Sequence, residues 1–457
     1  MTHQSTRFLE HAERKAFDLK HRKTINYNIS RYEEAIGIGL LQFANLENAK
    51  QRAANIRHKI LEHLDEYLIE FESNFKSRGG RVIWALNKKE AVREILQVLK
   101  QNDVKSVVKS KSMTSEELDL NEVLEKHSIE SIETDLGEYI VQLAGEKPYH
   151  ILTPAMHKSK EDIAVLFNEK FGLSSDSTPE EMTAFVREKL RQKFVQAGAG
   201  ITGANFLIAD IGAIALTENE GNALMSMAFP KIHIVIAGIE KVIPSFSDLS
   251  LFWPLLSSHG TGQNLSVYNS ILTGPRNEKE MDGPQEMIVV LLDNDRTEVL
   301  RQKLHRRALS CIHCGACLNV CPIYKNIGGH SYETTYTGPI GSVISPYFYD
   351  FNQFIHLSFA SSLCGRCTEI CPVKINLHEL LLFNRNEAVK RGLTSPGEKM
   401  AMKGWRKIMH KRYRIDMWSA NTKNKALSYF FSRAWGPRRT LPVIQKKSFR
   451  QRWIENG

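Results

Sequence analysis

Several classes of protein are excluded by what this sequence has little of. Its 457 residues contain no run of about 18 apolar residues, so we expect no membrane-spanning helix. The first residues, MTHQSTRFLEHAERKAF, lack the apolar core of a secretory signal, so we expect none. Proline (15) and glycine (28) are too few for a collagen-like chain, and no internal repeat is present. The hydrophobic fraction of 42% is that of an ordinary globular protein, and the length predicts two to four domains.

Cysteine is absent from the first 310 residues and from the residues after 371. All seven cysteines lie between these limits. A disulfide-bonded secreted protein would spread an even number of cysteines over its domains. An odd, tightly grouped set instead indicates a metal site in a reducing compartment, and we expect a cytoplasmic protein.

The cysteine spacing predicts two iron–sulfur clusters. Residues 311–322 carry the C-x2-C-x2-C-x3-C-P pattern of bacterial ferredoxins, and residues 364–372 carry a shorter copy, C-x2-C-x3-C-P. In two-cluster ferredoxins, the cysteine before the proline binds the other cluster. The predicted ligands of a first, [4Fe–4S] cluster are therefore Cys311, Cys314, Cys317 and Cys371. Those of the second cluster are Cys321, Cys364 and Cys367.

The second set is one thiolate short, and Ser361 stands where its fourth cysteine would be. The second cluster is then either [3Fe–4S], or [4Fe–4S] with one iron bound to Ser361, water, a substrate or a partner group. Zinc is the alternative metal, but it needs four ligands per ion and does not explain the ferredoxin spacing. Because seven thiolates fill the predicted ligand positions, His313 and His330 are interpreted as ordinary residues.

Apolar runs that alternate with helical patterns predict an α/β domain with a largely parallel sheet. The predicted strands are 81–86, 104–108, 150–153, 205–210, 232–237 and 287–292, and the clearest helices are 89–100 and 179–196. The predicted domains are an N-terminal helical region (1–75), the α/β domain (76–296), a cysteine-bearing helical module (300–390) and a basic, aromatic region (391–457).

Gly198, Gly200 and Gly203 fit the letters of a dinucleotide-binding fingerprint. That fingerprint requires a strand before the glycines and a helix after them. Here a helical pattern precedes the glycines and a strand-like run follows them. We therefore expect no NAD or FAD at this loop, and we expect the glycines to allow a tight turn or a close approach of two backbone segments.

Four long motifs resemble the LUD family: KSKSMTSEE (109–117), ETDLGEYIVQLAGEKPYHILTPAMHK (133–158), GITGANFLIADIGAIALTENEGN (200–222) and PKIHIVIAGIEKVIP (230–244). The helical, aromatic-rich sequence between the two cysteine motifs resembles the α-helical ferredoxin modules of succinate dehydrogenase iron–sulfur subunits and heterodisulfide reductase subunits. Together these features resemble the LutB family of iron–sulfur subunits of the lactate utilisation system. The resemblance implies a domain related to NagB, RpiA and the CoA transferases. It also implies oxidation of L-lactate to pyruvate with LutA-like and LutC-like companion subunits.

Polar residues within these motifs are candidates for binding a small organic acid, because open α/β sheets bind ligands beside turns at strand ends. They are Lys111, Ser112, Ser115, Glu133, Asp135, Glu138, Asn219, Glu220 and Asn222. Capping of helices and closing of turns explains the same residues equally well. We expect His150 and His157 to be structural, and the spacing identifies no catalytic residue.

The charge changes sharply near the end of the chain. Residues 390–457 contain 18 Lys/Arg, 3 acidic residues and four of the six tryptophans, Trp405, Trp418, Trp435 and Trp453. No nucleic-acid-binding module is recognisable, and the apolar residues do not form the single stripe of a membrane-surface helix. Tryptophan with arginine is typical of protein interfaces, so we expect docking to an acidic partner or to the chain's own α/β domain.

These features indicate an electron-transfer subunit of a cytoplasmic complex that oxidises lactate. The sequence shows no flavin or nicotinamide motif, so a companion subunit or a bound cofactor is expected to break the substrate C–H bond. Two alternatives stay open at this point. One is a redox sensor whose α/β domain binds a small ligand, and the other is a catalytic iron in the second cluster, as in a dehydratase.

Overall fold

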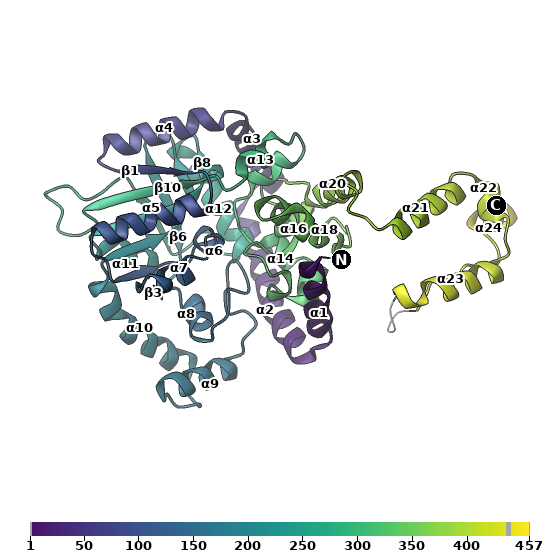
Figure 1. The fold of residues 1–457 in the computed structure, drawn as a ribbon, viewed down its shortest axis with the longest axis horizontal. Helices are drawn as coiled ribbons and strands as arrows, with labels where there is room; N and C mark the ends of the chain where they lie inside the picture. The colour runs from purple at the N-terminus through teal and green to yellow at the C-terminus, as the bar shows by residue number, and fades with distance from the viewer. Residues whose placement is uncertain (1, 436–439, 457) are drawn as a thin grey trace. The chain divides into compact units, whose positions relative to one another are not determined.

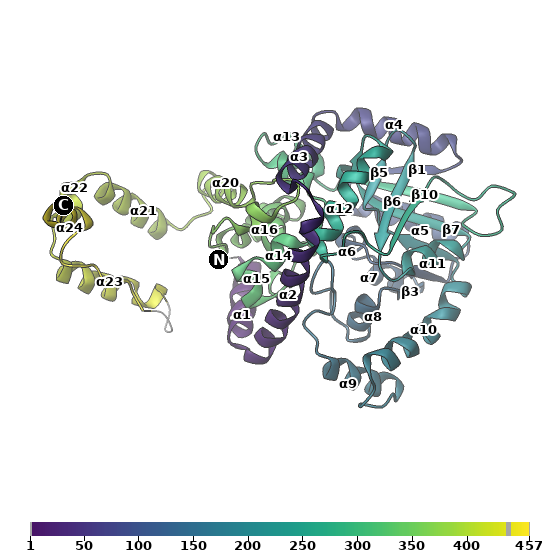
Figure 2. The same cartoon turned by 180° about the vertical axis from the view of Figure 1, so that it is seen from behind.

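The computed structural model describes residues 2–435 and 440–456, and the chain divides into two units, Met1–Glu387 and Ala388–Gly457 (Figures 1 and 2). Four helices open the first unit: α1 (His3–Phe17), α2 (Leu19–Gly39), α3 (Leu46–Glu62) and α4 (Leu64–Ser77). The i, i+4 spacing of Ile56, Ile60, Leu64 and Leu68 predicts one amphipathic helix; the last three are buried and Ile56 is half-buried, but the run is divided between α3 and α4. Helix α3 is held by Arg57, a fully buried side chain that donates hydrogen bonds to the backbone carbonyls of Glu240, Val242, Leu309 and Ser310.

The main sheet is entirely parallel, which confirms the predicted α/β class. Its strands lie in the order β1 (Arg81–Ala85), β10 (Glu286–Leu292), β7 (Ile232–Gly238), β4 (Ala199–Thr202), β2 (Ser106–Lys109) and β3 (Glu130–Glu133). Successive residues of a strand point to opposite faces, so β10 contributes to two cores. Ile288 and Val290 pack in the core with α5 (Lys88–Gln101), whereas Val289 and Leu291 belong to the core on the other face.

A second sheet belongs to the core on that other face. Its order is β8 (Val242–Ile243), β5 (Phe206–Ile208), β6 (Ala213–Glu218) and β9 (Tyr268–Leu272). The remaining helices of this region are α6 (Met113–Glu117), α7 (Leu120–Lys126), α8 (Leu136–Leu143), α9 (Lys160–Phe171), α10 (Pro179–Gln196), α11 (Asn222–Ala228) and α12 (Leu249–Gly260), with 3-10 turns η1 (Leu40–Gln42), η2 (Ile239–Lys241) and η3 (Phe246–Asp248). Helices α5 and α7 lie in front of the main sheet in Figure 1, and β5, β6 and α12 come to the front in Figure 2. The main sheet is therefore covered on both faces.

One predicted strand is wrong. Residues 150–153 form an irregular loop because the buried His150 imidazole closes its own turn. Its Nδ1 accepts hydrogen bonds from the backbone N–H groups of Leu152 and Thr153, and its Nε2 lies 3.1 Å from Asn319 Oδ1. The role of His150 is structural, as expected.

The glycine-rich segment 198–203 contains strand β4 rather than a dinucleotide-binding turn, with Gly198 just before the strand and Gly203 just after it. Gly200 belongs to β4, where a Cβ atom would overlap the carbonyl oxygen of Ser226 in α11. The expected close approach of two backbone segments is therefore confirmed at Gly200. The helix and the strand could not pack this closely with a larger residue.

The cysteine-bearing module is built from short helices, as expected for an α-helical ferredoxin module. It contains α13 (Arg296–Arg301), η4 (His305–Ser310), α14 (Ala316–Asn319), α15 (Pro322–Ile327), η5 (His330–Tyr332), α16 (Gly338–Phe348), α17 (Phe351–Phe354), α18 (His356–Phe359), α19 (Arg366–Ile370) and α20 (Leu377–Lys390). Helix α1 packs against α15, and α14 packs against α19. The second contact brings the two cysteine motifs together.

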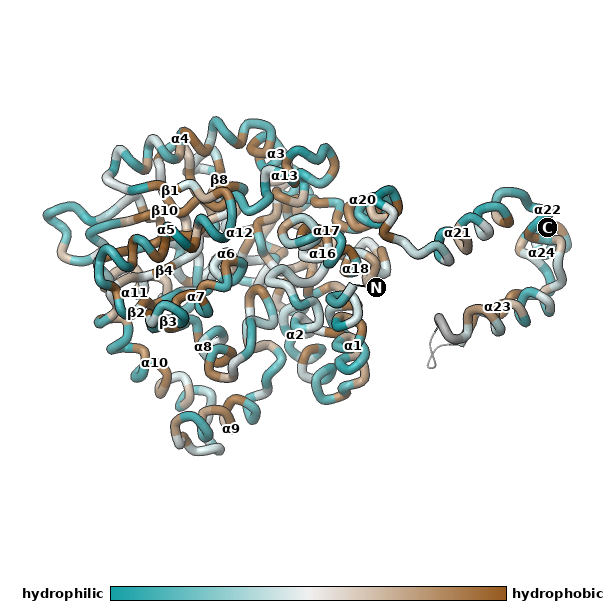
Figure 3. Tube along the Cα trace, in the orientation of Figure 1, coloured by the Kyte–Doolittle hydropathy of each residue, from teal (hydrophilic) through white to brown (hydrophobic). Residues whose placement is uncertain are grey.

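The second unit contains α21 (Pro396–Met409), α22 (Arg412–Asp416), α23 (Ala420–Trp435) and α24 (Phe449–Asn456). Hydrophilic and hydrophobic residues alternate along α21 and α23 in Figure 3. Trp405, Trp418 and Trp453 are exposed, each by more than half of its surface. Within the described ranges, every helix of the chain is too short or too polar to cross a membrane.

Candidate cluster-binding and ligand-binding sites

Both cysteine motifs contain the same backbone turn. Gly315 and Gly365 have φ angles of +75° and +84°, and each is the residue from which a short helix starts, α14 and α19 respectively. This left-handed conformation favours glycine, so the two motifs share a local reason to contain it. All seven cysteines are free thiols; Cys314, Cys317, Cys367 and Cys371 are buried, and Cys364 is exposed.

The electrostatic neighbours of the thiols cross between the two motifs. Burial and, to a smaller extent, the charge of Cys371 from the second motif raise the pKa of the Cys311 thiol to about 11. Burial raises the pKa of Cys367 to about 12, and the charge of Cys321, from the first motif, adds to the effect. Cys371 therefore lies near the thiols of the first motif, and Cys321 near those of the second.

The spacing of the thiols fits clusters better than single zinc ions. Among the described residues, which include every cysteine, no three thiols lie within 4.8 Å of one another. A tetrahedral zinc ion with bonds of about 2.3 Å would hold its sulfur ligands about 3.8 Å apart. The thiolates of an iron–sulfur cluster bind different iron atoms and do not need that proximity.

Hydrogen bonds and cations surround the first set of thiols. The backbone N–H groups of His313 and Ile375 donate to the sulfur atoms of Cys311 and Cys371, each at 3.4 Å. Lys241 is buried, and burial lowers its pKa to about 8, against the opposing charges of Glu240 and Cys311. Such groups around cluster ligands stabilise thiolate charge and set the reduction potential.

A cavity of about 380 Å³ lies in the α/β region and reaches the cysteine-bearing module. His313, between the first two cysteines, and Tyr336 line the cavity together with Lys241. Six of the nine predicted ligand-binding residues also line it, namely Lys111, Ser112, Asp135, Asn219, Glu220 and Asn222. The loop that carries the first cysteines is therefore part of the cavity wall.

Within this cavity, two of the lining residues cap helices, as the capping interpretation predicts. Ser112 caps α6 and Asp135 caps α8 through side-chain oxygens that accept backbone N–H hydrogen bonds. Lys111 Nζ lies 3.2 Å from Asp135 Oδ2 and donates to the carbonyl of Leu152. Burial raises the pKa of Glu220, and the charge of Asp135 raises it further. The cavity therefore contains a fixed cation and a carboxyl group that retains its proton more readily than usual.

The other three predicted residues, Ser115, Glu133 and Glu138, do not line the cavity. They surround Lys109, whose Nζ lies 2.7 Å from Glu133 Oε1 and 3.0 Å from Ser115 Oγ. Burial alone would lower the pKa of Lys109, but Glu133 and its neighbours reverse the effect and raise it. Burial and the charge of Glu133 raise the pKa of Glu138 well above its ordinary value. These residues form a buried polar network behind the cavity.

Comparisons with known proteins agree with this architecture. Residues 68–292 match the LUD domain and residues 307–375 match the 4Fe-4S dicluster domain. Lactate utilization protein B of Bacillus cytotoxicus is 46% identical over 363 residues, which are 79% of this chain and 76% of that protein. The chain belongs to the lactate utilization protein B family. The same protein of Bacillus cereus strain AH820 is 44% identical over the same shares of both chains.

Two further proteins are similar to this member of the lactate utilization protein B family. The uncharacterized electron transport protein YkgF of Escherichia coli is 40% identical over 424 residues, which cover 91% of this chain and 89% of that one. A crystal structure of a DUF162 family protein from Deinococcus radiodurans aligns with 50% of this chain and 98% of its own, at 13% identity and a TM-score of 0.29. The family resemblance expected from the motifs is confirmed.

Sequence reasoning missed several residues of the site in this family member. Lys241 and Glu218 line the cavity, and Lys109 forms an ion pair with Glu133 in the buried polar network. None of these three residues is a predicted candidate. Lys109 and Lys241 each stand beside a short apolar run, a position where a charged residue signals a strand end. Because the seven thiols satisfy the ligand count, the sequence gives no reason to single out His313, and only the fold shows that it lines the cavity.

Proposed function

We propose that this chain is the iron–sulfur electron-transfer subunit of a cytoplasmic complex that oxidises L-lactate to pyruvate. The observation that carries the proposal is the cavity wall, where His313 connects the α/β region to the first cysteine loop. A small organic acid in this cavity would lie beside the predicted cluster loop. Two relatives, lactate utilization protein B and the uncharacterized electron transport protein YkgF, carry names that support the same role.

The proposed ligands follow the crossed thiol neighbourhoods. The first cluster is [4Fe–4S] on Cys311, Cys314, Cys317 and Cys371. The second is [4Fe–4S] or [3Fe–4S] on Cys321, Cys364 and Cys367, with Ser361 as a further candidate. In this assignment, residues 76–296 bind the small ligand and residues 300–390 hold the clusters, between the helical region 1–75 and the basic region 391–457.

Oxidation of L-lactate to pyruvate removes two electrons and two protons from the substrate. Bound iron–sulfur clusters would supply one-electron acceptors placed next to each other. A companion subunit of the LutA or LutC type, or its cofactor, takes the hydride equivalent. This chain's own residues bury four of the seven thiols, place Arg57 and Lys241 beside Cys311, and hold His313 in the cavity wall.

Anaerobic reconstitution tests the cofactor part of this proposal. Iron analysis is expected to give seven or eight irons per chain, and EPR of the reduced protein is expected to show two magnetically interacting clusters. Zinc at the cysteines without iron would contradict the assignment.

The functional part is tested by mixing the reconstituted chain with its LutA-like and LutC-like companions. Dye reduction that depends on L-lactate should require all components. A redox sensor would instead respond to oxidant in isolation and would add nothing to the companions' activity. That result would replace electron transfer with regulation.

A further inference from the structure

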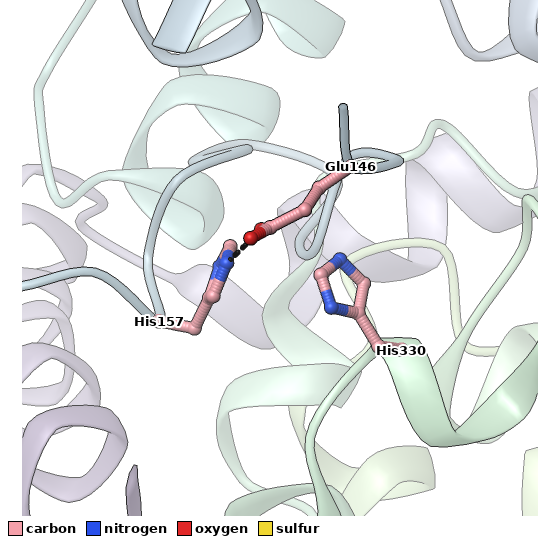
Figure 4. Close-up of side chains that lie close together, drawn as sticks. All are labelled: Glu146, His157 and His330. Carbon is pink, nitrogen blue, oxygen red and sulfur yellow. Dashed lines mark hydrogen bonds and ion pairs between the residues drawn. The ribbon is translucent and has the colours of Figure 1, made fainter. Parts of the chain in front are cut away.

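A cluster of metal-ligating side chains contains no cysteine and no residue of the cavity wall. In the ranges 2–435 and 440–456, Glu146, His157 and His330 form the one group of three such residues whose ligand atoms all lie within 4.8 Å of one another. Their side chains converge in Figure 4. Glu146 and His157 come from the loop after α8, and His330 begins the η5 turn that follows α15. The cluster therefore joins the LUD domain to the 4Fe-4S dicluster domain.

The hydrogen bonds leave nitrogen atoms available to a metal ion. His330 Nε2 lies 2.7 Å from the carbonyl oxygen of Lys147, so this nitrogen carries the hydrogen and Nδ1 keeps its lone pair. A ring N–H that donates to a backbone carbonyl is the arrangement that orients histidine ligands of metals. On His157, the nitrogen in question is Nε2, which lies 2.6 Å from Glu146 Oε2 and would bind the ion in place of the hydrogen shared with that carboxylate. The buried Nδ1 of His157 has no hydrogen-bond partner and would then carry the ring hydrogen.

The two imidazole rings are held in place by aromatic contacts. The ring of Tyr149 stacks on His157 with 4.7 Å between centroids and meets His330 edge-on at 4.9 Å. The Tyr149 hydroxyl lies 2.8 Å from His21 Nε2, and a Cβ atom at Gly328 would overlap this hydroxyl. Because Tyr149 is enclosed, it fixes both imidazoles near one point.

Nearby cations restrict which metal fits. Lys158 Nζ lies 2.8 Å from Glu146 Oε1, and the charge of Lys15 acts on both histidines. One carboxylate that is already paired gives little attraction for Mg²⁺ or Ca²⁺, which depend on several oxygen ligands. Divalent first-row transition metals form strong bonds to imidazole nitrogen and depend less on local negative charge.

We propose that Glu146, His157 and His330 bind one divalent transition metal ion, with Zn²⁺ as the preferred ion and water completing its coordination. The ion takes the place of the hydrogen shared by His157 and Glu146. It fastens the loop after α8 to the η5 turn, and so holds the LUD domain against the cluster module. The site does not depend on the proposed electron-transfer role.

The test uses the full-length, cluster-loaded chain, so that the cysteines are occupied. The protein is incubated with one equivalent of Zn²⁺ and dialysed, and zinc and iron are then counted. We expect about one zinc per chain, with zinc-edge X-ray absorption showing nitrogen or oxygen neighbours at about 2.0–2.1 Å and no sulfur at about 2.3 Å. His157→Gln and His330→Gln should each lower bound zinc at least tenfold with iron unchanged, whereas a thousandfold excess of Mg²⁺ should not displace zinc from the wild type.

His58→Gln is the matched control, because His58 is a partly exposed histidine that also faces a glutamate, Glu62, but has no third ligand. This variant should keep its zinc. If a histidine variant fails to fold, Glu146→Gln provides the second test and should weaken zinc binding at least tenfold. Zinc with sulfur neighbours, no bound zinc, or unchanged zinc in the folded variants would overturn the proposal.

Discussion

Arg296 and Glu117 form a bidentate ion pair with no solvent exposure on either side chain. Nη1 and Nη2 of Arg296 lie 2.9 and 2.8 Å from the two carboxylate oxygens of Glu117. Tyr336 from the cysteine-bearing module donates its hydroxyl to the same carboxylate at 2.7 Å, and Arg296 Nε lies 2.6 Å from Glu240 Oε2. The pair thus connects α6 and the sheet to the module that holds the cysteines.

Removing one partner of this pair should be strongly destabilising, because the other charge stays buried. We expect Glu117→Ala to lower the free energy of unfolding by about 3–5 kcal/mol. Tyr336→Phe removes one hydrogen bond to a charged group and should cost about 1.5–3 kcal/mol. Urea unfolding of the cluster-loaded protein measures both effects. The exposed variant Glu298→Ala is the control and should change stability by less than about 0.5 kcal/mol.

Glu138 should make stability depend on pH. Folding raises the pKa of Glu138 above its value of about 4.3 in the unfolded chain. At a pH between these two pKa values, Glu138 is protonated in the folded protein and ionised in the unfolded chain. Stability contributed by that proton is therefore present at low pH and is lost as the pH rises through this interval. Glu138→Gln imitates the protonated form, so its unfolding free energy should fall less between pH 5.5 and 8 than that of the wild type.

Urea midpoints measured across this pH range test the role of Glu138. The exposed Glu125→Gln variant is the control and should follow the wild-type pH profile. Parallel profiles for wild type and Glu138→Gln would show that Glu138 is ionised in the folded protein.

If the ligands cross between the motifs, the last cysteine of each motif binds the cluster that is held mainly by the other motif. Cys371→Ser should perturb the cluster on Cys311, Cys314 and Cys317 and leave the other signal intact. Cys321→Ser should do the reverse. EPR and iron counting after anaerobic reconstitution show which of the two clusters each variant has lost. If each substitution affected the cluster of its own motif, the crossed assignment would be wrong.

Lys111 should contribute to binding of a small organic acid in the cavity. A charged hydrogen bond to a carboxylate contributes about 1.5–3 kcal/mol, so Lys111→Met should raise the dissociation constant for L-lactate or pyruvate at least tenfold. Isothermal titration calorimetry on the cluster-loaded chain gives this value. The exposed Lys231→Met variant should bind as the wild type does. If the wild type, Lys111→Met and Lys231→Met bind the acid with equal affinity, the acid does not bind at Lys111.

The basic second unit should bind an acidic surface of a companion subunit. Lys403, Arg406 and Lys407 are exposed on α21, next to exposed Trp405. Reversing these three charges to glutamate should weaken association with the LutA-like and LutC-like subunits at least tenfold at low salt, with iron content unchanged. Reversing Lys100, Lys105 and Lys126, which are exposed on the α/β domain, is the control. An affinity for the companion subunits that changes neither with these substitutions nor with salt concentration would contradict this interface.

Local patterns in the sequence were enough for the class of fold and the type of metal centre. Apolar runs predicted the strands 232–237 and 287–292, because a strand buried on both faces is continuously apolar. The run 81–86 also predicted a strand, although β1 lies at the edge of the sheet with Trp84 exposed. Cysteine spacing predicted clusters, since ligands from one motif must meet within a few residues. The same pattern wrongly predicted a strand at 150–153, where these residues form a turn that the His150 side chain closes.

Relations between distant segments came from the folded chain alone. Residue spacing contains no information on whether His313 faces the α/β cavity, or whether Glu146 and His157 meet His330 more than 170 positions later. These contacts depend on how α1–α4 and the cysteine module pack against the sheet, and thus on many weak apolar contacts summed over the whole core. The amino-acid pattern specified which chemistry this protein can hold. Packing specified which of those groups share one site.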